Sequence, residues 1–356
     1  MREIFNRLRK AGDTLRSAAS REESDDRQIA TDGGAEAVVG DRRRDTLRDS
    51  LPVQWELIES APFWLPPVLL AGFFVYGAIF WNILLSMTDF QGLGEPNYGQ
   101  LDFSMYTTML SDGAFWQATQ NTVVLLVVFT ILCLALGMLV AILIDQNIRF
   151  ENTFRTIYLL PMSLSFVVTA TMWAWVYNAK NGVFNQLLRL LNLEGLVVSL
   201  LKPEMVNATV VQWLSWNTTA LAAVIFALIW QFSGYAMVVF LAGLRAIPDE
   251  HYEAARVDGA STVRMYLRVI IPQLRASAVS ASVVLMVFAL KAFDFIYALR
   301  GSQPGANLDI LATMMYRVAF SSLRWAYGSA VAIVLFVLAL LIIGPYLYSE
   351  YKRGQL

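Results

Sequence analysis

Six long apolar runs divide the chain, each close to the length of a membrane-spanning helix, and polar segments separate them. A hydrocarbon core about 30 Å thick needs roughly 20 apolar helical residues. Lipid offers backbone polar groups no hydrogen-bonding partner, so each run predicts a helix. The pattern therefore predicts an all-α membrane protein with six transmembrane helices, at about residues 63–87, 123–144, 157–177, 219–244, 278–299 and 327–348.

The composition agrees with a multi-pass protein of the cell membrane, because 57% of the 356 residues are hydrophobic and only 15% are charged. Charged residues concentrate in residues 1–60, which we predict to be a largely disordered tail with a possible interfacial helix. Residues 61–350 form the predicted transmembrane domain. The net charge of −1 gives no reason to expect nucleic-acid binding. One cysteine and one histidine make a multi-cysteine or histidine-based metal centre improbable.

The distribution of Lys and Arg predicts the orientation. An even number of spans places both termini on one side, together with the loops 145–156 and 245–277. Positive residues are about three times denser on that side than in the opposite loops. The termini are therefore predicted to be cytoplasmic.

The cytoplasmic loop 245–275 carries the pattern of two short helices joined by a tight turn. Pro248 suits a first helical position, and Gly259 can take the left-handed conformation that ends a helix. Ser261 can cap the next helix, and Pro272 is expected to end it. The loop is either a solvated connector or a hairpin that docks into a groove on a soluble partner. Small residues at its centre favour docking.

One pattern in this loop resembles the EAA signature of ABC importer permeases. It consists of Glu253-Ala254-Ala255, Gly259, Val269 and Ile271-Pro272, where the family usually has Ile and Leu in place of Val269 and Ile271. Weaker motifs resemble the carbohydrate branch, of the maltose and glycerol-3-phosphate type: Asn121-Thr122, Phe154-Arg155, Leu160-Pro161, Ala242-Gly243-Leu244, Phe293-Asp294, Tyr316-Arg317 and Ala319-Phe320. Gly301-Ser302-Gln303-Pro304 departs from the Gly-Gly-Pro run that the family more often has.

The resemblance implies a type I ABC importer (MetI-like) permease fold and transport by alternating access. It also implies a second, different permease subunit, two cytosolic ATPase subunits and an extracellular solute-binding protein. ATP and Mg²⁺ would be bound by the ATPases and no cofactor by this chain, which has no G-x-x-x-x-G-K-[ST] phosphate loop and is not predicted to be an enzyme. In the family the hairpin contacts the ATPase, which assigns this role to Glu253, Ala254, Ala255, Asp258 and Gly259.

A sugar path at membrane depth needs aromatic faces and polar partners for hydroxyl groups. Position relative to the family landmarks suggests candidates in the fourth and fifth runs, and helix packing is their alternative role. These candidates are Gln231, Phe232, Tyr235, Phe288, Ala289, Ala292 and Phe293. Helices are expected either to bend or to pack closely at three further positions: Gly234, Gly243 and Pro161.

Lys291 and Asp294 are the only full charges within the six runs. Charges in a span are expensive and face protein or water. At a spacing of three residues they can pair with each other, or they can line the translocation path. A different class of protein, an ion-coupled secondary transporter, would use them for coupling, but the inverted halves typical of that class are not visible in the sequence.

Overall fold

The computed structural model describes residues 54–146, 149–201 and 210–352, and all the regular structure in these ranges is helical. The chain divides into two units, Met1–Ala78 and Ile79–Leu356. The described part of the first unit holds α3 (Gln54–Ala71) and a π-helical turn, Gly72–Tyr76. The predicted interfacial helix and most of the predicted tail lie outside the described residues.

Within the described residues, five helical segments are long and apolar enough to cross a membrane: Ser60–Ser86, Gly113–Asp145, Ala220–Arg245, Thr262–Arg300 and Trp325–Tyr348. They confirm five of the six predicted spans. The first comprises the end of α3, the π-helical turn and α4 (Gly77–Ser86). The others contain α6 (Gly113–Asp145), α11 (Ala220–Arg245), α14 (Arg275–Leu290) and α17 (Trp325–Lys352).

The third predicted span is not one straight helix, which corrects the expectation for residues 157–177. It consists of α7 (Glu151–Leu159), a 3₁₀ turn at Leu160–Ser163 and α8 (Phe166–Val176), and the chain bends by 97° between the two arms. Pro161 in the 3₁₀ turn has no backbone N–H, so the α-helical hydrogen bonding lapses there. The side-chain nitrogen of Gln231 donates to the Leu164 carbonyl oxygen at 2.8 Å and so satisfies a backbone group that the bend leaves open.

A second bent pair follows α8 in the chain. It consists of α9 (Val183–Leu190) and α10 (Glu194–Leu201), which meet at 118°. A small cluster of buried apolar side chains packs beneath this pair: Val198, Val211 and Trp216.

The fifth span is longer than predicted and contains an internal break. Pro272 does not end the preceding helix, contrary to expectation. A π-helical turn (Tyr266–Ile270) and a 3₁₀ turn (Ile271–Leu274), which contains Pro272, connect α13 (Thr262–Met265) to α14. The helix instead breaks at Lys291 and Ala292, after which α15 (Phe293–Arg300) begins.

The core of the second unit is the contact between α6 and α11, with α14 packed against both. Two glycines allow this approach: a Cβ at Gly137 would lie 2.5 Å from the Ala236 Cβ, and one at Gly243 2.5 Å from the Ser277 hydroxyl. Gly234 allows α7 to approach α11, because a Cβ there would lie 2.6 Å from the Tyr158 carbonyl oxygen. Helix α11 runs unbroken through Gly234 and Gly243, so both glycines serve packing. Of the three proposed bending points, only Pro161 lies at a bend.

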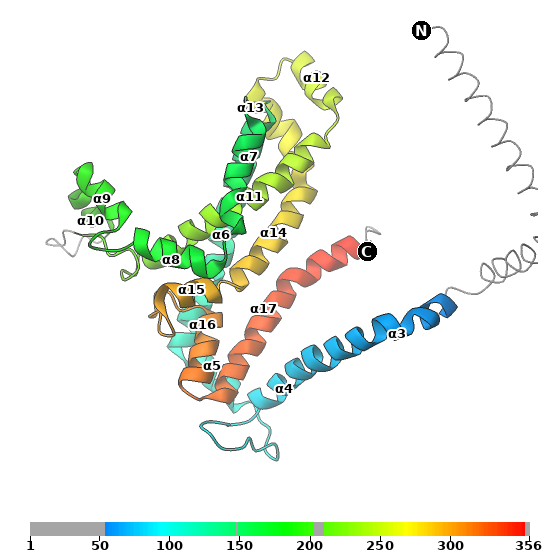
Figure 1. Cartoon of the computed structure of the whole chain (residues 1–356), viewed down its shortest axis with the longest axis vertical. Coiled ribbons are helices and arrows are strands. Elements are labelled where there is room, and N and C mark those ends of the chain that lie inside the picture. Colours follow the sequence, from blue (N-terminus) through cyan, green and yellow to red (C-terminus); the bar gives the residue numbers. More distant parts are fainter. Residues whose placement is uncertain (1–53, 147–148, 202–209, 353–356) are drawn as a thin grey trace, which may run out of the picture. The chain divides into compact units, whose positions relative to one another are not determined.

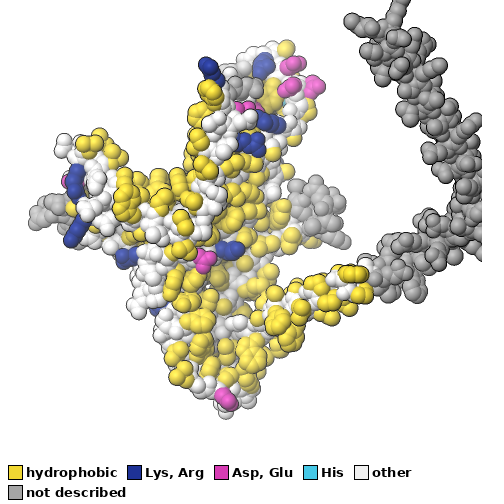
Figure 2. Space-filling model, in the orientation of Figure 1, with side chains coloured by type: hydrophobic (Ala, Val, Ile, Leu, Met, Phe, Trp, Pro, Cys, Tyr) yellow, Lys and Arg dark blue, Asp and Glu magenta, His cyan; other side chains and the backbone are white. Residues whose placement is uncertain are grey.

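A second cluster joins α5 (Ser104–Ser111), α16 (Leu311–Tyr316) and the beginning of α17 at the end of the unit opposite α12 (Asp249–Val257) (Figure 1). Apolar side chains cover wide areas of the surface shown in Figure 2, whereas acidic and basic side chains gather around the end that carries α12 and α13. This distribution suits a body that lies in lipid and exposes one charged end to water.

Candidate coupling hairpin and substrate path

The α12–α13 hairpin is closed by a Schellman motif at Gly259. Its φ is +74°, the Ala260 N–H donates to the Ala255 carbonyl oxygen at 3.0 Å, and the Gly259 N–H donates to the Arg256 carbonyl oxygen at 3.0 Å. This is the helix-ending conformation predicted from the sequence. Pro248 stands one position before α12, and Ser261 occupies the cap position of α13 without a side-chain capping bond.

The outer face of this hairpin is apolar and exposed. Val257 is 87% exposed, Val263 68% and Leu267 61%. Ala254, Asp258 and Gly259 are exposed with them, whereas Ala255 packs inward. Exposed aliphatic residues that lie together are typical of protein-binding surfaces.

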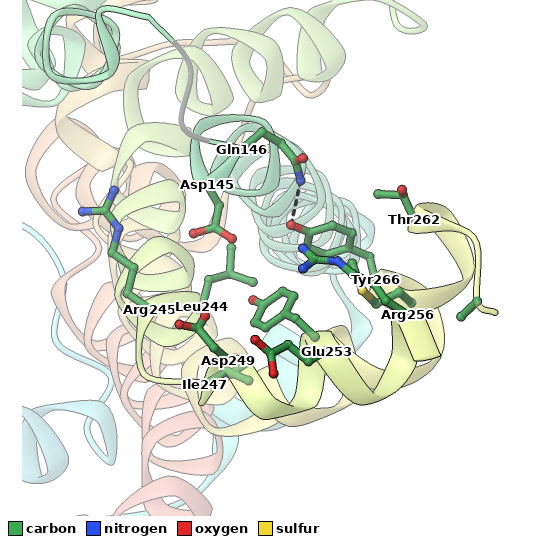
Figure 3. A pocket seen from close by; sticks show the side chains of 13 residues that line it. Asp145, Gln146, Leu244, Arg245, Ile247, Asp249, Glu253, Arg256, Thr262 and Tyr266 are labelled. Carbon is green, nitrogen blue, oxygen red and sulfur yellow. Dashed lines mark hydrogen bonds between the residues drawn. The ribbon is translucent and has the colours of Figure 1, made fainter. Parts of the chain in front are cut away.

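Behind the hairpin lies an open cavity of about 920 Å³, seen in Figure 3. Asp249, Glu253 and Arg256 line it from α12, Arg245 lines it from the end of α11, and Asp145 lines it from the end of α6. Glu253, the first residue of the EAA pattern, is therefore exposed along a cavity wall that carries charges of both signs.

Three polar contacts connect the helix ends around this cavity. The Gln146 side-chain nitrogen donates to the Tyr266 hydroxyl at 2.7 Å, and Asp145 also hydrogen-bonds with Tyr266. Glu151 at the start of α7 forms an ion pair with Arg245. The Tyr252 ring packs against the Tyr266 ring at 6.3 Å, and burial raises the pKa of Tyr252 to about 12, so its hydroxyl stays protonated at physiological pH. None of these links was predicted from the sequence.

Three of the seven substrate-path candidates contact one another where α11 meets α14, and several of the seven are buried. The Phe232 ring stacks on Phe288 at 4.5 Å, and Tyr235 meets Phe288 edge-on at 6.4 Å. Gln231, Phe232, Ala289 and Ala292 are buried, while Tyr235, Phe288 and Phe293 are partly exposed. Gln231 supports the α7–α8 bend, and its side-chain oxygen has no hydrogen-bond partner within the described residues.

Lys291 and Asp294 lie at the break between α14 and α15, and both are exposed. The described residues contain no ion pair between them, so the expected pairing is not formed. Lys291 instead follows the C-terminal end of α14 and Asp294 lies in the first turn of α15. The C-terminal end of α14 favours the Lys291 cation and the N-terminal end of α15 favours the Asp294 anion.

Residues 133–350 match the family model of the binding-protein-dependent transport system inner membrane component. The chain belongs to this family. It is accordingly a multi-pass permease subunit of an ABC transporter and not the ATP-hydrolysing subunit, as the EAA pattern predicted. An ion-coupled secondary transporter, the alternative considered above, does not fit this family.

Relatives and solved structures agree. This permease is 53% identical over 302 residues to the "Xylose/arabinose import permease protein XacH" of Haloferax volcanii, which covers 85% of this chain and 90% of the relative. It is 30% identical over 238 residues to the "Trehalose/maltose transport system permease protein MalF" of Thermococcus litoralis, covering 66% and 74%. A chain of a bacterial alginate ABC transporter superposes with a TM-score of 0.67 at 20% identity, covering 85% of this permease and 98% of that chain. This likeness shows the fold of ABC importer permeases.

Proposed function

We propose that this permease imports a sugar, that it pairs with a second, different permease, and that two cytosolic ATPase subunits drive it through the α12–α13 hairpin. An extracellular binding protein delivers the sugar. The observation that carries the proposal is the hairpin itself: a Schellman turn at Gly259 presents Val257, Val263 and Leu267 to solvent at the charged end of the molecule. The positive-inside distribution of Lys and Arg supports a cytoplasmic position for this end.

The contacts behind the hairpin suggest how its movement reaches the spans. The turn at Gly259 connects α12 to α13. Tyr266, in the segment after α13, bonds with Gln146 at the end of α6. Ion pairing between Arg245 and Glu151 joins α11 to α7. When ATP binding closes the ATPase pair, the hairpins move with it and α6, α7, α11 and α14 follow. ATP shifts the equilibrium between inward- and outward-open states only by its different affinity for the two.

A pentose is the first substrate class to test, because a relative 53% identical to this permease carries xylose and arabinose in its name. Lys291 and Asp294 are suited to hydrogen-bond the hydroxyl groups of a neutral sugar from the α14–α15 break. The partly exposed candidates would line the path: Tyr235, Phe288 and Phe293. The buried candidates would support these side chains by packing against them: Gln231, Phe232, Ala289 and Ala292.

Cysteine labelling tests the docking surface. The single native cysteine, Cys133, is fully buried, so a Val257→Cys variant has one accessible thiol. We expect a maleimide to label this thiol in the permease alone and to be excluded when the permease is purified in complex with its ATPase subunits. Leu93→Cys is the matched control, because Leu93 is 90% exposed in a loop remote from the hairpin. Equal labelling of Val257→Cys with and without ATPase would contradict docking.

An ATPase assay tests the substrate. The purified complex is mixed with its binding protein and a panel of pentoses, hexoses and disaccharides. We expect xylose or arabinose to stimulate hydrolysis above the level obtained with the unloaded binding protein. Stimulation by a hexose alone would replace the pentose, and no stimulation by any sugar would contradict sugar import.

A further inference from the structure

Five aromatic side chains beyond the α14–α15 break contact one another in a row, and we name this row the aromatic ladder. Phe293 contacts Tyr297 and Tyr316 at ring-centroid distances of 5.4 and 5.1 Å. Tyr316 contacts Phe320 at 5.1 Å, and Phe320 contacts Trp325 at 5.2 Å. The members come from α15, α16, a π-helical turn at Arg317–Ser321 and the start of α17.

The ladder is continuous from the charged break to the far end of the molecule. It begins one residue before Asp294, and it ends at Trp325, whose indole nitrogen donates to the Gly92 carbonyl oxygen at 2.9 Å. Gly92 belongs to the loop between α4 and α5, at the end opposite the coupling hairpin. A ring lies every 5 to 6 Å along this course.

The ladder is partly open rather than sealed in the core. Tyr297 is 38% exposed and Phe320 is 54% exposed. Phe320 lies in the π-helical turn, a geometry that is rare and concentrates at functional sites. Arg317, in the same turn, pairs with the largely buried Asp309 at 2.5 Å. The segment that presents Phe320 is therefore held by an ion pair.

The exposed side of the ladder shares a helix face with a charged residue. Asp294 and Tyr297 are three residues apart on α15 and share one face of that helix. A carboxylate at membrane depth faces water or protein, and the ring of Tyr297 looks in the same direction. That direction is either the translocation path or the surface of the second permease.

We propose that the aromatic ladder is a binding track for the sugar, leading it from the outer opening to Lys291 and Asp294. The inference rests on the proposed function and extends its site. Flat aromatic faces suit the C–H faces of a pyranose ring, and the two tyrosine hydroxyls supply hydrogen-bonding groups beside them. A packing surface for another permease does not require rings at regular intervals that end at two charges without an ion pair among the described residues.

The test measures uptake of labelled xylose by the complete complex in proteoliposomes, at increasing concentrations of loaded binding protein. Tyr316→Leu and Phe320→Leu remove one ring each, and Phe320→Tyr keeps the ring. Phe226→Leu is the matched control, because Phe226 is 52% exposed and lies in a separate aromatic cluster with Trp173 and Phe184. We expect both ladder variants to slow uptake about two- to tenfold, as loss of one aromatic contact implies. The yield of the complex and its basal ATP hydrolysis should be unchanged in all these variants. Uptake should be unchanged in Phe320→Tyr and Phe226→Leu.

Three results would overturn the track, and they separate it from the proposed function. Normal uptake by both leucine variants removes the track and leaves sugar import standing. Loss of the second permease during purification of the variants makes the ladder a subunit interface. A wild-type complex that hydrolyses ATP but takes up no sugar overturns the proposed function, and the track with it.

Discussion

The side-chain nitrogen of Gln146 lies 2.7 Å from the hydroxyl oxygen of Tyr266, although 120 residues separate the two in the chain. Gln146 follows the last residue of α6, and Tyr266 follows the last residue of α13. The bond therefore connects a long span directly to the hairpin that we assign to ATPase docking.

Tyr266→Phe tests this connection. The change removes the hydroxyl that bonds with both Gln146 and Asp145 and keeps the ring that packs against Tyr252. A net loss of about 0.5–1.5 kcal/mol is typical of each such bond, so we expect the sugar transported per ATP hydrolysed to fall at least about twofold while hydrolysis continues. Tyr252→Phe is the control, since the Tyr252 hydroxyl makes no hydrogen bond within the described residues. An unchanged ratio in Tyr266→Phe would show that α6 receives the motion elsewhere.

Gly259→Ala tests the hairpin angle. A Cβ at Gly259 would meet no atom within 4 Å, so the effect comes only from the φ of +74°. A left-handed conformation costs a non-glycine residue about 1–2 kcal/mol. We expect less ATPase to co-purify with this variant, with normal membrane insertion.

Gly305→Ala is the control for Gly259→Ala, because Gly305 has a φ of +85° and an equally open Cβ position away from the hairpin. It should retain the ATPase. Equal loss of ATPase from both variants would mean that general strain, rather than the hairpin angle, governs assembly.

Much of the fold follows from the sequence because its signals are local. Apolar runs long enough to cross lipid predict the spans, and Gly259 after a short helical pattern predicts the turn. Pro161 was proposed as a bending point, but the 97° angle between the two arms could not be predicted, since Gln231 from another helix satisfies Leu164 there. The bond between Gln146 and Tyr266 could not be predicted either, because the sequence around each residue gives no sign of a contact across 120 residues. Lys291 and Asp294 were recognised, but their separation at a helix break was not.

Gly137→Ala tests the contact between α6 and α11. The added Cβ would lie 2.5 Å from the Ala236 Cβ and 2.8 Å from the Met237 nitrogen, so the two helices would have to separate. Overpacking of this kind costs about 1–3 kcal/mol, and the melting temperature of the detergent-solubilised permease should fall. Gly113→Ala, at the open N-terminal end of the same helix, should leave it unchanged or raise it. Equal melting temperatures for both variants would contradict the tight contact.

Arg317→Gln tests the ion pair that holds the end of α16. It leaves the largely buried Asp309 carboxylate with the Thr313 hydroxyl as its remaining partner. A buried group that loses one partner destabilises the fold by about 1–3 kcal/mol. Changing Asp309→Asn as well removes the unpaired charge, so thermal unfolding should show the double variant to be more stable than Arg317→Gln alone. A double variant less stable than both single ones would contradict this explanation.

ATP-dependent uptake of xylose or arabinose by the reconstituted complex tests the central claim most directly, when wild type and Glu253→Ala are compared. Glu253 is exposed on the hairpin, so its replacement should leave the spans folded. We predict uptake by the wild-type complex that requires ATP and the loaded binding protein, and uptake at least tenfold slower in Glu253→Ala on the same amount of permease, the loss expected from removing a charge-assisted contact of about 1.5–3 kcal/mol. Uptake that persists without ATPase subunits, or that is equal in the two complexes, would contradict the account.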